Sequence, residues 1–69
     1  MVAQRQSVAG ALRPGMRVEV VNHFTGTWAH GFEVFGLSPS GCRVRRVSDQ
    51  AVIPIDFDLL DVRVEGERR

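Results

Sequence analysis

The stretch that decides the fold is residues 28–37, which read Trp-Ala-His-Gly-Phe-Glu-Val-Phe-Gly-Leu. Successive side chains of a strand point to opposite faces, yet large apolar groups stand on both faces of this stretch. Gly31 and Gly36 divide it, and a glycine inside a strand is typical of a bulge or a sharp bend. We therefore predict one long strand that bends enough to wrap around a small barrel, because a flat sheet does not suit this mixed pattern.

The segment before this strand alternates regularly. Val18 and Val20 share one face, and Arg17 and Glu19 share the other, which is the period of a half-buried strand over residues 16–21. Residues 13–15, Arg-Pro-Gly, form a turn that leads into it. The connection over residues 22–27 is too long for a two-residue hairpin and is unusually aromatic for a loop.

Three shorter segments follow a turn predicted at residues 38–41. Residues 42–47 and 51–55 are predicted as the third and fourth strands. Pro54 places the fourth at a sheet edge or ends it there, because proline has no N–H to donate. Asp56 caps a single helical turn, and residues 61–65 alternate as a short fifth strand. We expect an all-β, five-stranded antiparallel barrel whose one interior holds Val18, Val34, Val44, Ile53 and Val62.

The composition fits one small globular domain. The chain has 69 residues, of which 43% are hydrophobic and 25% charged, with a formal net charge of +1. We expect a loose lead-in over residues 1–12, the barrel over residues 13–65 and a frayed tail over residues 66–69. No run approaches the ~18 apolar residues of a membrane span. The single cysteine, Cys42, has no partner for an internal disulfide, which indicates a reducing, cytoplasmic location.

The order of these elements resembles the Src-homology-3-like small barrels, and most of all their Tudor and Agenet type. The stretches that carry the resemblance are PGMRVEV (14–20), GTW (26–28), GFEV (31–34), VIPI (52–55) and LLDVR (59–63). The resemblance implies a binding module in which aromatic rings at one end can form a cage for methylated lysine or arginine. Trp28 matches one ring of that cage and Phe24 could be a second. The chain has no tyrosine, and its third-to-fourth turn holds only polar residues, so methyl-ligand recognition is not carried over.

Two aromatic residues near the first loop are candidates for partner contact. Trp28 is open to two interpretations, a binding ring or a core residue packed on Val18, Val44 and Leu60, and we favour the core because so small an interior needs its one Trp. Phe24 is predicted to be exposed, which makes it a recognition candidate.

The leading hypothesis is a protein or peptide interaction module. A groove between the first loop and the second and third strands would use Phe24, Trp28 and Phe35 for apolar contact and Arg43 and Arg45 for charge. Self-association through the same aromatic patch is a further expectation.

The alternative is a small barrel that binds nucleic acid, with phosphates contacted by Arg43, Arg45 and Arg46. The low net charge argues against nucleic-acid binding. The simpler interpretation is that these arginines lie on a solvated strand face and pair with Glu19, Glu33 or Asp49. No catalytic residues, no cofactor and no metal site are expected, because no known catalytic motif or metal-ligand spacing is present.

Overall fold

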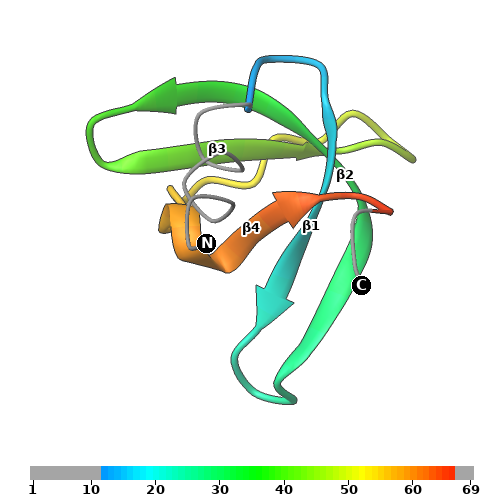
Figure 1. Cartoon of the computed structure of the whole chain (residues 1–69). Coiled ribbons are helices and arrows are strands. Elements are labelled where there is room, and N and C mark those ends of the chain that lie inside the picture. Colours follow the sequence, from blue (N-terminus) through cyan, green and yellow to red (C-terminus); the bar gives the residue numbers. More distant parts are fainter. Residues whose placement is uncertain (1–11, 67–69) are drawn as a thin grey trace.

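The computed structural model describes residues 12–66, which form one antiparallel sheet (Figure 1). Its strands are β1 (Arg17–Asn22), β2 (Thr27–Ser38), β3 (Gly41–Arg46) and β4 (Val62–Val64), arranged in the order β3-β2-β1-β4. One 3₁₀ turn, η1 (Leu59–Asp61), precedes β4. The prediction of an all-β antiparallel fold with a single helical turn before the last strand is confirmed.

β2 is the strand that joins the two halves of the sheet. Its first part pairs with β1 over residues 27–33, and its second part pairs with β3 over residues 32–38. The register slips opposite Val18 and Val20 and again between Val34 and Gly36. Gly31 lies in the first irregular stretch with a φ of +97°, a conformation that favours glycine. β2 accordingly curves along its length (Figure 1), and its two register irregularities lie at Gly31 and next to Gly36, the glycines that the sequence indicated.

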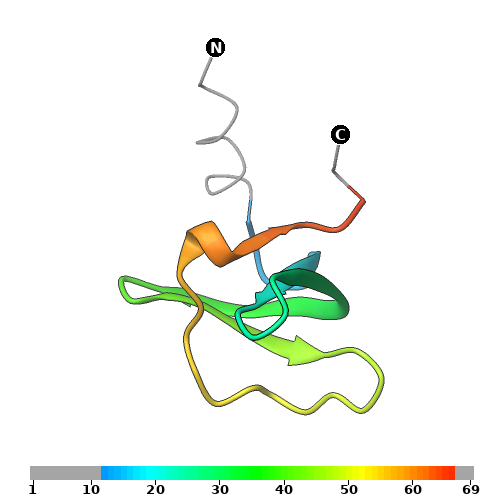
Figure 2. The same cartoon turned by 90° about the horizontal axis from the view of Figure 1, so that it is seen from below.

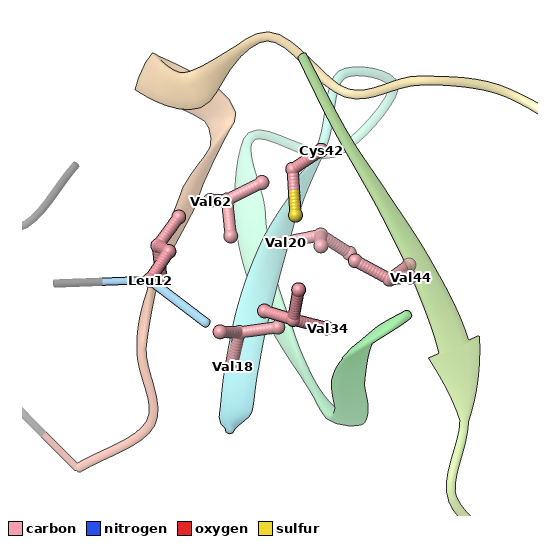
Figure 3. Packing of buried hydrophobic residues seen from close by; sticks show 7 residues of the cluster. All are labelled: Leu12, Val18, Val20, Val34, Cys42, Val44 and Val62. Atoms are coloured by element: carbon pink, nitrogen blue, oxygen red, sulfur yellow. The ribbon is translucent and has the colours of Figure 1, made fainter. Parts of the chain in front are cut away.

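A single core lies on one side of this sheet. Seven buried residues form it, and Figure 3 shows them converging from all four strands and from the segment before β1: Leu12, Val18, Val20, Val34, Cys42, Val44 and Val62. Ile53 packs against them, so the five residues expected in one interior do share it. Leu12 was expected in the loose lead-in, but it is buried and extends the packed region by one residue. The rest of the lead-in, and the tail from residue 67 onward, lie outside the described residues.

The predicted fourth strand over residues 51–55 is wrong as a regular strand. This segment and the residues just after it follow the free edge of β3 but pair with it through two isolated bridges, Arg45 with Val52 and Cys42 with Phe57. Ile53 donates its N–H to the carbonyl of Val44 at 2.9 Å, and the chain then bends at Pro54, which has no N–H with which to continue the ladder. Figure 2 shows the segment running from the end of β3 back toward η1.

The predicted closure into a five-stranded barrel is likewise not what the structure has. β3 and β4 are the two outer strands of an open sheet, and β4 has only three residues. The irregular segment along β3 makes too few ladder contacts to act as a fifth strand that would close the sheet. Gly41 allows that segment to approach, because a Cβ at this position would collide with the carbonyl oxygen of Phe57. In the described part of the chain, no helix is long and apolar enough to cross a membrane.

Candidate functional site

The turn between β1 and β2 holds Phe24 out into solvent. The side chain of Phe24 is 99% exposed, as predicted. The turn around it is ordered by its own polar groups: the Asn22 carboxamide oxygen accepts hydrogen bonds from the N–H groups of Phe24 at 2.8 Å and Thr25 at 3.3 Å. Gly26 donates its N–H to the Asn22 carbonyl at 2.7 Å and adopts a φ of +76°. The ring is therefore presented by a loop with defined geometry.

The same turn contacts η1. Nε2 of His23 lies 3.0 Å from Oδ2 of Asp61, a residue of η1 that is far away in the sequence. The residue that caps η1 is Asp58 and not Asp56 as expected from the sequence, since Oδ1 of Asp58 accepts the N–H of Leu60 at 3.0 Å. Leu60 is 85% exposed, so it does not pack in the core as the sequence analysis expected. We call the β1–β2 turn and η1 together (residues 23–26 and 59–61) the turn–helix end.

Trp28 lies on the face of the sheet that points away from the core, and the favoured prediction of a core Trp is wrong. The register slip in β2 breaks its alternation, so that Ala29 and Phe32 pack against the core while Trp28 stands opposite Val21. The guanidinium carbon of Arg63, on β4, lies 4.1 Å from the centroid of the Trp28 ring. One face of the ring is therefore already covered by a cation of the same chain.

Arg63 is held in place by a carboxylate as well as by the ring. Its Nε donates to Oε1 of Glu19 at 2.7 Å, and Glu19 itself is buried on β1 with only 7% of its surface exposed. No local pattern in the sequence indicated this contact, because it depends on the pairing of Glu19 with Arg63 across β1 and β4.

Phe35 and Arg45 come together on β2 and β3, as the predicted site required. The guanidinium carbon of Arg45 lies 5.7 Å from the centroid of the Phe35 ring, which is half exposed. Arg45 also donates to Oε2 of Glu33 through Nε at 2.8 Å and through Nη2. Phe35 stands seven residues beyond Trp28 on the curved β2, a separation of up to about 23 Å. The structure therefore places the predicted groove residues Trp28 and Phe35 in two separate groups, Trp28 with Arg63 and Phe35 with Arg45.

The other two arginines of the β3 region are also paired with carboxylates. Nε of Arg43 donates to Oδ1 of Asp56 at 2.8 Å, and Arg46 binds Asp49 through Nε at 3.1 Å and Nη2 at 2.9 Å. The hydrogen bond from Arg46, with a further one from the N–H of Ala51, lowers the pKa of Asp49 to about 2. Hydrogen bonds from Arg43 and then Ser40 lower the pKa of Asp56 as well. The arginines of the β3 region therefore form ion pairs with carboxylates of the same chain.

The remaining nucleophilic or ligating groups do not converge. Cys42 is completely buried, and its burial, followed by the charge of Asp56, raises the pKa of its thiol. Among residues 12–66 there is no group of three or more His, Cys, Asp or Glu side chains that could hold a metal ion.

Comparison with known proteins returned no match to a protein-family model, to a curated protein or to a solved structure.

Proposed function

We propose that this chain is a non-catalytic binding module that contacts a protein or peptide partner. The observation that carries the proposal is that most of the arginines described by the structure are paired with carboxylates of the same chain. Five arginines of the described region form ion pairs within the chain: Arg17 with Glu65, Arg43 with Asp56, Arg45 with Glu33, Arg46 with Asp49, and Arg63 with Glu19. Large apolar side chains are also left exposed, foremost Phe24 and Leu60, and exposed apolar side chains of this kind favour protein contact.

The relation to the Src-homology-3-like barrels of Tudor and Agenet type is part of this proposal. It is supported by the strand order, by the strongly bent β2, by the 3₁₀ turn before β4 and by the segment that follows the edge of β3. A cage for a methylated side chain is not part of it. Arg63 already covers one face of Trp28, and an incoming cation would have to displace it. A cytoplasmic location belongs to the same proposal.

The test is a quantitative pull-down from an extract of the source cells, with the full chain and variants as bait. We expect at least one protein that the chain retains and that a combined Phe24→Ala, Phe35→Ala and Arg45→Ala variant loses. Size measurement of the purified chain checks whether a second copy is the partner. If the chain runs as a monomer and every retained protein is also retained by the combined variant, the proposal is wrong.

The alternative, nucleic-acid binding through Arg43, Arg45 and Arg46, is supported less well. Each of these guanidinium groups is engaged by a carboxylate, and a phosphate would have to compete with Asp56, Glu33 or Asp49 for it. Binding of this kind would weaken steeply as salt is added. A mobility-shift assay at low salt with RNA and with DNA decides it, and the absence of any shift would end the alternative.

A further inference from the structure

We propose that the turn–helix end is the convex half of a knob-and-pocket interface: Phe24 inserts into an apolar pocket of a folded partner protein, Leu60 on the linked η1 adds apolar contact, and basic residues rim that pocket. This inference rests on the proposed function and names the partner's surface. It differs from a groove on this chain that receives an extended peptide.

The exposure of Phe24 decides between knob and groove. A side chain that lines a groove is partly covered by its own protein, whereas Phe24 is 99% exposed. A ring in this position becomes buried only where a partner surrounds it. Aromatic residues that enter a pocket in this way are typical dominant contributors to an interface. The concave surface must therefore belong to the partner.

The turn that carries Phe24 is ordered before any partner arrives. Asn22 accepts two backbone N–H groups of the turn, Gly26 closes it onto the Asn22 carbonyl, and the hydroxyl groups of Thr25 and Thr27 lie 2.7 Å apart. An ordered loop loses less conformational entropy on binding than a flexible one. Such ordering suits a ring that is inserted into a shaped pocket.

Leu60 enlarges the apolar contact. The 3.0 Å contact between His23 and Asp61 joins the two residues that adjoin Phe24 and Leu60 in the sequence, so the turn that carries Phe24 is linked to η1, which carries Leu60. They are also the two most exposed of the large hydrophobic residues that the structure describes. Neither contributes to the core, so their exposure is not explained by the needs of folding.

The charge beside the knob indicates the rim of the pocket. Among the carboxylates of residues 12–66, Asp58 is the one for which the structure shows no cationic partner, and it stands two residues before Leu60. Asp61 has only His23. Carboxylates at this position attract lysine or arginine of a partner and repel phosphate. This end of the molecule therefore suits a protein with a basic rim and does not suit a nucleic acid or an anionic lipid surface.

The test replaces Phe24 with the photoreactive residue p-benzoylphenylalanine in the full chain. The chain is irradiated in an extract of the source cells, and the adduct is mapped by mass spectrometry. The adduct should fall in an apolar pocket of a folded protein, with Lys or Arg at the rim. The purified partner should then bind Phe24→Ala and Asp58→Arg about tenfold more weakly than the unaltered chain, with Leu60→Ala and Asp58→Asn intermediate.

Ile55→Ala is the matched control. Ile55 is also an exposed aliphatic residue, but it adjoins Asp56, whose carboxylate is bound by Arg43 at the β3 side, and its replacement should leave the affinity unchanged. An adduct on an extended, unstructured segment would overturn the inference. A partner that binds Phe24→Ala normally but is lost with Arg45→Ala would also overturn it, while the proposed function would stand. If no protein distinguishes the chain from any of these variants, both fail.

Discussion

The outer face of the sheet and the turn–helix end use their side chains in opposite ways. The outer face lies opposite the core and carries two partly buried, hydrogen-bonded pairs. These are Glu19 with Arg63 and Glu33 with Arg45. At the turn–helix end, the largest side chain, Phe24, has almost no contact with the rest of the chain. The comparison indicates that the paired charges of the outer face stabilise the fold, whereas the proposed binding function rests on the exposed apolar side chains of the turn–helix end. Substitutions in the two regions should therefore separate stability from affinity.

The largest loss of stability is expected from Arg63→Ala. This change removes the charge-assisted hydrogen bond to buried Glu19 and uncovers the ring of Trp28. We expect the free energy of unfolding to fall by about 2 kcal/mol. Urea denaturation measures it, with Arg63→Lys as the control that keeps the positive charge without the planar stack. A loss below about 0.5 kcal/mol would show that the outer face does not stabilise the fold in this way.

A smaller loss is expected from Glu33→Gln. The change keeps the shape of the side chain but removes the charge that Arg45 binds, at a site where both side chains are partly buried. The expected destabilisation is about 1 kcal/mol in the same urea experiment. Added salt should lessen the difference between the variant and the unaltered chain, because the interaction is electrostatic. A difference that is insensitive to salt would point to altered packing instead.

Lowering the pH should destabilise the fold by weakening the ion pairs of the β3 region. The pKa of Asp49 is about 2 in the folded protein, against an ordinary value of 3.8, because of its hydrogen bonds from Arg46 and Ala51. A lowered pKa stabilises the fold above the unfolded value, and this contribution is lost as the pH falls from about 4 toward about 2. Urea midpoints measured across this range should decline less steeply for Asp49→Asn. Identical slopes for the two proteins would contradict the pairing.

The smallest effect on stability is expected at the turn–helix end. Phe24→Ala and Leu60→Ala remove exposed side chains that contribute nothing to the core, so the free energy of unfolding should change by less than about 0.5 kcal/mol. A larger loss in either variant would mean that the end is part of the folded framework. The contrast between the two regions would then disappear.

Much of the fold could be predicted from the sequence, because alternation and turn residues are local signals. Val18 and Val20 marked the first strand correctly, and Gly31 and Gly36 marked the places where the register of the second is irregular. The face of Trp28 could not be predicted in the same way. A bulge shifts the alternation by one residue, and its position depends on the pairing of β2 with β1.

The errors in the candidate site have the same origin. Leu60 was expected in the core as a residue on which Trp28 would pack, but a residue of a single 3₁₀ turn has no strand period to fix its direction. The partners of Arg43 and Arg63 depend on which strand or segment lies beside them, and no local pattern specifies that. Exposure of Phe24 was predictable, since turn residues surround it on both sides.

The pairing of β2 with both β1 and β3 limits how the protein can unfold locally. Phe32 and Glu33 pair with β1 on one side and with β3 on the other, and the N–H of the next residue, Val34, donates to the carbonyl of Met16 at 2.9 Å. Neither hairpin can detach without disturbing this crossing, so fraying should begin at the hairpin tips and stop there. Backbone amide protons around Val34 should exchange with deuterated solvent only when the whole chain unfolds at once.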